Sequence, residues 1–404
     1  MKQSAITELV AALTGFARAN DFAGYCKHDG LNSPILHALS LNNRWLRLIF
    51  IQTVMRFPIN LRPWLLTEKS RNPKGISLFA RGYLLLYEVT GHEEYRRLAE
   101  ELLDWLTQHH SNQEGKYHGV CWGYNFIWQS PFFHAPKYSP NLTVSVFPGE
   151  SFLLGYNLIK RPDYLDQARG VAEFVLNDLP VLLETETEKC LGYVPAGVSE
   201  KVININSMAA AFLAKLYVAT NEPKYKDNAL KLTRFVANQA FAGDRWAYTT
   251  DFDRSYVDNY HTGGIIDELL EVMESLDHWE WKPLLLRAVE YYEKHLFTPD
   301  GAPKNRDNQE YPYDIHGSAQ GVITFAKVSR LNPEYLHLAE KILDWTIKEL
   351  YSGDGYFYYQ KTKYYTKRFS FMRWCNAWML YALGEYLGAK NKLNRRNEND
   401  HAGQ

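Results

Sequence analysis

The sequence lacks the features that mark nucleic-acid-binding and membrane-spanning proteins. Its 404 residues carry 45 Lys and Arg against 46 Asp and Glu, and a net charge of −1 argues against nucleic acid as a partner. The longest apolar run near the start, Leu9 to Leu13, is too short for a membrane span or a signal peptide. We therefore expect no transmembrane segment and a cytoplasmic location.

Signatures of metals, cofactors and disulfides are also missing. The sequence has no CxxC pair, no HExxH motif and no glycine-rich phosphate loop of the Walker or Rossmann type. Its four cysteines are widely separated, which argues against a disulfide framework: Cys26, Cys121, Cys190 and Cys375. We expect neither a metal nor a cofactor.

The sequence does contain repeated pairs of helical segments, and 46% of its residues are hydrophobic, enough for a large core. Apolar residues recur at helical spacing in each segment, and an aromatic loop with glycine follows each pair. The predicted pairs are Gly75 to Gly91 with Glu93 to His109, Gly149 to Leu158 with Asp163 to Leu183, Asn206 to Thr220 with Pro223 to Phe241, Thr262 to Leu276 with His278 to Leu296, and Gly317 to Leu331 with Pro333 to Leu350. A last helix, Arg373 to Leu387, has no following partner.

The interval between these pairs predicts a closed ring. The later first helices begin near Asn206, His261, His316 and Arg373, which are 55, 55 and 57 residues apart. Linear helical solenoids have shorter units, of roughly 34 to 47 residues. An N-terminal helix, from 2 to 20 or from 33 to 57, would supply the sixth pair. We predict an all-α (α/α)6 toroid with short β-hairpin-like loops on one face, formed by residues 1–390 as one domain, and a polar, disordered tail over 391–404.

The segment Asn43 to Leu66 mixes arginines with large apolar residues. One interpretation is a peripheral contact with a membrane, and the other is an amphipathic helix that closes the ring. We favour the second, because Pro58 and Pro63 interrupt any long surface helix.

The inner helices of such a ring begin at one mouth, where equivalent repeat positions would surround a shared space. Tyrosine and tryptophan gather in the adjoining loops, and their flat apolar faces with polar tips suit sugar rings. We predict a saccharide as the partner, and both acidic and neutral saccharides stay open. The substrate-binding candidates are Trp122, Tyr124, Trp128, Asn141, Glu150, Asn206, Trp246, Tyr260, Tyr313, Gln320, Arg373 and Trp374.

Two acids are the first candidates for catalysis. Asp258 and Asp314 each stand where a helix begins, and glycoside hydrolysis needs two carboxyl groups, one protonated and one ionised. Lower-ranked acids are Asp251, Asp253 and Glu150. Each Asp could instead only cap its helix, or fix the tautomer of a nearby histidine.

His261 and His316 are the alternative catalytic candidates. Paired histidines could move a proton at a sugar carbon in epimerisation or elimination. Arg373 could then hold a carboxylate or phosphate of the substrate. A histidine near a helix start is also often structural, so both interpretations stay open.

Several short motifs, taken in order and spacing, resemble a bacterial family found with exopolysaccharide and capsule biosynthesis, the VpsJ type. They are Asn60-Leu-Arg-Pro63, Arg71-Asn-Pro-Lys-Gly75, Cys121-Trp-Gly-Tyr124 with Trp128-Gln129, Pro140-Asn-Leu142, Asp258-Asn-Tyr-His-Thr-Gly263, Tyr311-Pro-Tyr-Asp-Ile-His316 with Ala319-Gln320, and Met372-Arg-Trp374 with Ala377-Trp-Met-Leu380. More distantly, the chain is similar to six-hairpin glycosidases, sugar 2-epimerases and polysaccharide lyases. The resemblance implies a fold and a pathway, and it supplies no reaction.

Three hypotheses follow for the function. The first is a glycoside hydrolase that acts on a poly- or oligosaccharide through Asp258 and Asp314. The second is an epimerase or lyase that acts on a uronic-acid-containing glycan through His261 and His316. The third is a glycan-binding or assembly factor without turnover.

Overall fold

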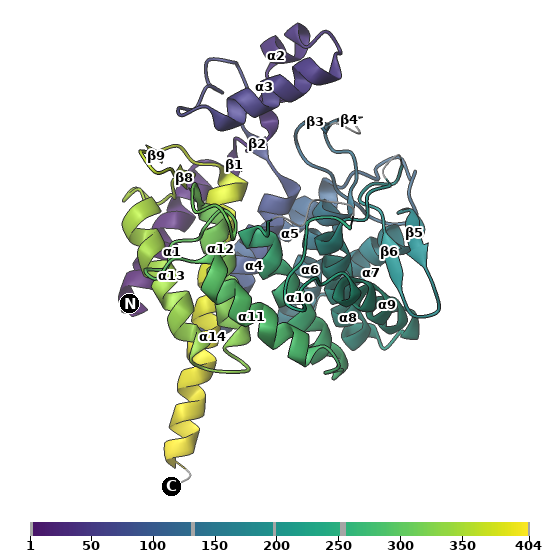
Figure 1. The fold of residues 1–404 in the computed structure, drawn as a ribbon, viewed down its shortest axis with the longest axis vertical. Coiled ribbons are helices and arrows are strands. Elements are labelled where there is room, and N and C mark those ends of the chain that lie inside the picture. The colour runs from purple at the N-terminus through teal and green to yellow at the C-terminus, as the bar shows by residue number, and fades with distance from the viewer. Residues whose placement is uncertain (1–2, 131–133, 197–198, 251–255, 403–404) are drawn as a thin grey trace.

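A closed ring of inner helices organises the molecule. The computed structural model describes residues 3–130, 134–196, 199–250 and 256–402 (Figure 1). Each inner helix contacts the next one along the chain, and the last contacts the first, which closes the ring. The (α/α)6 toroid is therefore confirmed. The inner helices are α4 (Pro73–Thr90), α6 (Leu142–Ile159), α8 (Ile203–Thr220), α10 (Asn259–Leu276), α12 (Ile315–Val328) and α14 (Trp378–Ala402).

An outer helix packs against each inner helix. In the chain order these are α5 (Glu93–Gln108), α7 (Pro162–Asn177), α9 (Pro223–Asn238), α11 (Lys282–Leu296) and α13 (Tyr335–Leu350). The sixth outer helix is α1 (Gln3–Ala19), which contacts α14. Of the two N-terminal segments predicted to complete the ring, residues 2–20 therefore do so.

The segment from 33 to 66 lies away from the ring, so our preferred interpretation of a ring-closing helix was wrong. It forms α2 (Pro34–Leu39) and α3 (Arg44–Arg56), which project beyond the face where the inner helices begin (Figure 1). Helix α3 packs on the short 3-10 helix Asp29–Asn32 and on β3 (Trp128–Gln129), and Lys367 donates a hydrogen bond to the Arg56 carbonyl at 3.0 Å. Helical periodicity shows that this segment has an apolar face, but it does not show which part of the protein packs against that face.

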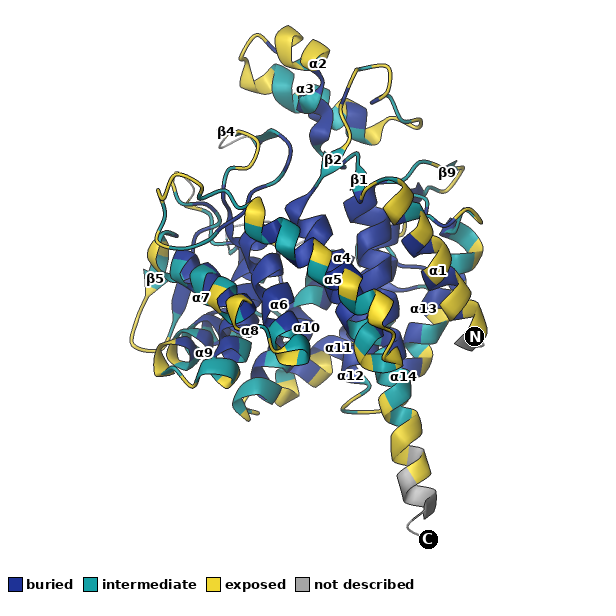
Figure 2. Ribbon diagram, turned by 180° about the vertical axis from the view of Figure 1, so that it is seen from behind, coloured by how far each residue is buried: buried dark blue, intermediate teal, exposed yellow. Residues whose placement is uncertain are grey.

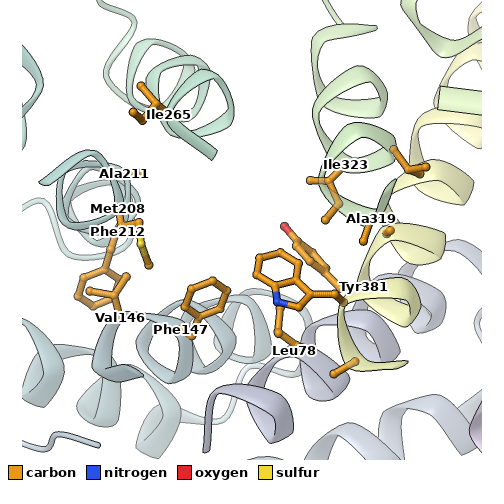
Figure 3. Packing of buried hydrophobic residues seen from close by; sticks show 14 of the residues in the cluster. Leu78, Val146, Phe147, Met208, Ala211, Phe212, Ile265, Ala319, Ile323 and Tyr381 are labelled. Carbon is orange, nitrogen blue, oxygen red and sulfur yellow. The ribbon is translucent and has the colours of Figure 1, made fainter. Parts of the chain in front are cut away.

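Burial follows the inner and outer positions of the helices. Every residue of α12 is buried, whereas α5 buries mainly Leu98, Leu102 and Leu106 on one face. The difference is visible in Figure 2, where the outer helices are partly exposed and the inner ones are mostly buried. Figure 3 shows buried apolar side chains contributed by all six inner helices, such as Leu78, Phe147, Met208, Ile265, Ile323 and Tyr381.

Short antiparallel strands occupy the loops that lead into the inner helices, as predicted for the loop face. They pair as β1 (Ala23–Gly24) with β2 (Ser70–Arg71), β3 with β4 (His134–Ala135), β5 (Val181–Glu184) with β6 (Lys189–Leu191), and β7 (Tyr313–Asp314) with β8 (Gln360–Lys361) and β9 (Thr366–Lys367). A π-helical turn, Met372–Ala377, precedes α14.

Two helix ends differ from the prediction. Helix α6 begins at Leu142 rather than Gly149, because the Asn141 side chain caps it and Pro148 is accommodated inside it. Helix α14 continues to Ala402 and extends beyond the ring, through the segment for which we predicted disorder (Figure 1). Among the described residues, no helix combines the length and apolar character needed to cross a bilayer.

Candidate active site

A cavity of about 410 Å³ opens where the inner helices begin. This volume is within the ~300–1,000 Å³ that is typical of small-molecule sites. Nine of the sixteen predicted site residues line it, and they come from α10, α12, the π-helical turn and the loop before α6: Tyr124, Trp128, Asp258, Tyr260, His261, His316, Gln320, Arg373 and Trp374.

Asp258 orients His261. The carboxylate caps α10 by accepting the backbone N–H of His261 at 3.0 Å, and its second oxygen contacts His261 Nδ1 at 2.8 Å. Burial alone would raise the pKa of Asp258, but the charge and hydrogen bonds of His261 outweigh burial and lower it. An ionised carboxylate accepts, so Nδ1 carries the proton and Nε2 is left to accept or deliver one.

His316 lies in an aromatic environment and is almost fully buried. Its ring stacks on that of Tyr260, with the ring centroids 4.5 Å apart. The ring centroids of Trp374 and Trp378 lie 4.5 and 4.4 Å from that of His316. Its Nδ1 has no hydrogen-bond partner among the described residues. Burial lowers the pKa of His316 well below 6.5, and the charges of Lys74, Lys27 and Arg373 lower it further. The neutral imidazole is therefore the resting form.

Tyr260 lies against both histidines. Its ring centroid is 4.4 Å from that of His261 and 4.5 Å from that of His316. The three residues share one cavity because α10 and α12 are neighbours in the ring and begin at the same face. A small substrate beside Tyr260 can therefore contact both imidazoles.

Two buried basic side chains also line the cavity. Lys74 at the start of α4 lies over the Phe147 ring at 3.9 Å, and no ion pair or hydrogen bond of its Nζ is found among the described residues. Burial lowers the pKa of Lys74 well below 10.5, and Arg373 lowers it further. The Nε of Arg373 is buried and has no hydrogen-bond partner in the described part of the chain. A negatively charged ligand group would satisfy both side chains.

Glu268 is a cavity residue that sequence reasoning missed. Burial raises its pKa well above 4.5, and its carboxyl group accepts a hydrogen bond from the Ser207 hydroxyl. It lies two helical turns after His261, and this spacing is the signal that could have identified it. Lys74 was also missed, although it stands at an inner-helix start within the Arg71-Asn-Pro-Lys-Gly75 motif.

Asp314 does not line the cavity. It caps α12 through the His316 N–H, and it accepts hydrogen bonds from Trp374 Nε1 and Gln360 Nε2, each at 2.7 Å. Lys27 approaches the same carboxylate at 3.5 Å. With its oxygens occupied in this way, Asp314 holds the aromatic surroundings of His316 in place.

The other predicted residues lie outside the cavity. Trp122 and Trp246 are core residues whose indoles donate to the carbonyls of Leu106 and Val236. Asn206 accepts the Leu191 N–H at 2.7 Å and so fixes β6 to α8. Asn141 caps α6, and Tyr313 packs on Trp345.

Glu150 belongs to a buried ion network inside the ring. It pairs with Arg81 of α4 and with Lys215 of α8, the latter at 2.8 Å. Burial would raise the pKa of Glu150, but these two cations lower it. Asp251 and Asp253 lie outside the described residues. Within the described part of the chain, no group of three or more His, Cys, Asp or Glu side chains could hold a metal ion.

Solved structures of carbohydrate-processing enzymes are similar in fold to this chain. A cellobiose 2-epimerase from Bacillus thermoamylovorans B4167 is 11% identical, over 78% of this chain and 87% of that chain, with a TM-score of 0.63. A sugar epimerase from a ruminal bacterium is 12% identical, over 81% and 90%, with a TM-score of 0.64. A family 76 α-mannanase from Bacteroides thetaiotaomicron is 14% identical, over 80% and 87%, with a TM-score of 0.60.

At these low identities, the likeness shows the fold alone. The chain has the six-hairpin (α/α)6 architecture that these proteins share. No family model matches the sequence, and no curated protein matches it either.

Proposed function

We propose that this protein is a carbohydrate-active enzyme that moves a proton at a carbon of an acidic saccharide, as an epimerase or a lyase. The observation that carries this proposal is that His261 and His316 line one cavity and both contact Tyr260. Fold similarity to sugar epimerases supports it. The resemblance of its motifs to VpsJ-type proteins favours a substrate from exopolysaccharide or capsule biosynthesis.

The two histidines differ in the way that acid–base chemistry needs. His316 is held neutral, so it can take a proton from a carbon next to a carbonyl or carboxylate group. Asp258 accepts from Nδ1 of His261 and so directs its Nε2 to exchange protons with the substrate. His261 then returns a proton to the opposite face of the carbon in epimerisation, or to the departing oxygen in elimination. Either path leaves the enzyme with the same number of protons after exchange with solvent.

Two basic side chains of the cavity favour an acidic substrate. Removing a proton next to a carboxylate builds negative charge on the carboxylate oxygens, and nearby cations stabilise that charge. Lys74 and Arg373 lie at the starts of inner helices, where free N–H groups add to the positive potential. A uronic-acid residue would present its carboxylate to these groups.

Hydrolysis through two carboxylates has less support from the geometry. Asp314 is occupied by Trp374, Gln360 and Lys27 and lies outside the cavity. The remaining cavity acids, Asp258 and Glu268, are ten residues apart around one helix, about 15 Å along its axis. Glycosidase carboxyl groups are about 5 to 9.5 Å apart.

The proposal is tested by incubating the protein in D₂O with uronic-acid-containing and neutral oligosaccharides. Proton NMR would show loss of one sugar C–H signal through solvent exchange, and absorbance would show an unsaturated product if elimination follows. New reducing ends without deuterium uptake would instead indicate hydrolysis. Tight binding without exchange or cleavage would indicate a glycan-binding protein.

A further inference from the structure

Residues 34–66, which we term the projecting hairpin, carry most of the strongly exposed apolar surface. The hairpin consists of α2, α3 and the segment that returns from Phe57 to Leu66, and Figures 1 and 2 show it standing beyond the ring. Seven of its large apolar side chains are more than half exposed, and they include Leu41 at 80% and Trp64 at 66%. Elsewhere in the described residues, only Val218 and Tyr364 are exposed to that degree.

The exposed side chains form a stripe on α3. Trp45 and Ile49 are four residues apart on α3, so they lie on one face of the helix, and the exposed Leu41 lies in the turn just before it. The opposite face is already used, because Ile51 and Val54 are buried against Gly30. Helix α3 therefore has one covered apolar face and one bare apolar face, and a bare patch of this kind marks an interaction site.

The charge on the hairpin has one sign. Residues 30–67 contain no Asp or Glu but four arginines. Arg62 is buried and neutralised by Asp29 at 2.5 Å, whereas Arg44 and Arg56 are exposed. A second copy of this chain docking through the same symmetric patch would bring arginines together, which is unfavourable. An anionic lipid surface complements both the charge and the apolar stripe.

We propose that the projecting hairpin docks the protein onto a membrane surface containing anionic lipid. Trp45, Ile49 and Trp64 enter the boundary between headgroups and acyl chains, where tryptophan is favoured, and Arg44 and Arg56 meet lipid phosphates. The hairpin lies in the interface and does not cross the bilayer. This proposal stands independently of the proposed chemistry.

Docking would also bring the cavity close to the membrane. Helix α3 contacts β3, where Arg47 reaches the Gln129 side chain at 3.5 Å. The neighbouring Trp128 lines the cavity. The hairpin is thus attached to the cavity mouth, and a docked protein would hold that mouth near the lipid surface.

The test is flotation of the full chain with vesicles of phosphatidylcholine alone or mixed with phosphatidylglycerol. We expect binding to the mixed vesicles, weakened by salt, and a drop of about tenfold or more in the Trp45→Ser/Trp64→Ser variant. Trp279→Ser is the matched control, because Trp279 is an exposed tryptophan far from the hairpin in sequence. It should bind like the unmodified chain.

A second variant, Arg44→Glu/Arg56→Glu, leaves the apolar stripe intact and should lose the preference for anionic vesicles. It keeps the test valid if the tryptophan variant folds poorly. Failure of the unmodified chain to float with either vesicle would overturn the proposal, as would equal loss in Trp279→Ser. A dimer in light scattering that becomes a monomer in the tryptophan variant, without vesicle binding, would overturn it in favour of self-association.

Discussion

His316 stacks on Tyr260 with ring centroids 4.5 Å apart and ring planes inclined by 17°. The other neighbour of Tyr260 in the cavity is His261, whose orientation is set by Asp258. Two imidazoles with different electrostatic surroundings thus share one aromatic platform.

Asp258→Asn should reduce kcat by about 10²- to 10⁴-fold while leaving stability nearly unchanged. Asparagine caps helices about as well as aspartate, so a purely structural role predicts little effect. It cannot act as an ionised acceptor for His261 Nδ1, so the tautomer that leaves Nε2 free for catalysis is no longer fixed. Steady-state kinetics and thermal unfolding test this together. Asp163→Asn, in the exposed first turn of α7, is the control, and an unchanged kcat in Asp258→Asn would contradict the role.

The acid limb of the kcat/KM profile should lie below pH 6.5. His316 must be neutral to act as a base, and burial with three nearby cations holds its pKa well below that value. Activity is therefore lost only as the pH falls through this lowered pKa. Lys74→Met removes one cation, which raises the pKa of His316 and moves the acid limb to higher pH. A shift to lower pH would exclude His316 as the group responsible.

Lys74→Met and Arg373→Lys should each raise KM for an acidic saccharide by about 10- to 100-fold, the usual worth of a charged hydrogen bond. Binding of a neutral analogue should change little, because it offers no carboxylate to these side chains. Calorimetric titration with the acidic and neutral sugars compares the two effects. Lys282→Met, on the exposed end of α11, is the control. Equal losses for both sugars would argue against an anionic substrate.

Glu268→Gln should become more stable than the unmodified protein as the pH rises above 4.5. Burial raises the folded-state pKa of Glu268, so the folded protein holds a proton that the unfolded chain releases near pH 4.5. Stability then falls with rising pH by at most ~1.4 kcal/mol per pH unit until the folded pKa is passed. The glutamine side chain does not titrate, so the stability of the Glu268→Gln variant does not fall with pH in this way. Urea unfolding from pH 4 to 8 measures the difference, and a difference that shrinks with pH would contradict the assignment.

Asp314→Asn should destabilise the fold by about 1–3 kcal/mol, because an amide group would face the donors Trp374 Nε1 and Gln360 Nε2. Lys27 would also lose its partner carboxylate. The molecules that remain folded should keep the catalytic rate of the unmodified protein. Denaturant unfolding and the rate per folded molecule separate the two effects, and complete loss of turnover with normal stability would restore the carboxylate-pair mechanism.

The sequence was sufficient to predict the ring and the meeting of the two histidines. The repeat of about 55 residues sets equivalent backbone positions, and His261 and His316 both occupy the first turn of an inner helix. The repeat does not set side-chain direction. Asn206 stands at the corresponding position of α8, yet its amide turns to the backbone of Leu191.

Other features depended on tertiary contacts that periodicity does not encode. Lys74 and Glu268 resemble ordinary helical residues in sequence, and only their burial at the cavity distinguishes them. The same limit applies to α3, whose pattern showed an apolar face without showing that the ring leaves it uncovered.

The most direct test of the histidine mechanism is solvent deuterium uptake by a uronic-acid-containing saccharide, compared between His316→Ala and Asp314→Asn. Both variants would be assayed at equal concentrations of folded protein, with the unmodified chain alongside. The account predicts that His316→Ala lowers the exchange rate by about 100-fold or more and that Asp314→Asn keeps it. Retention of exchange in His316→Ala, with its loss in Asp314→Asn, would contradict the histidine mechanism.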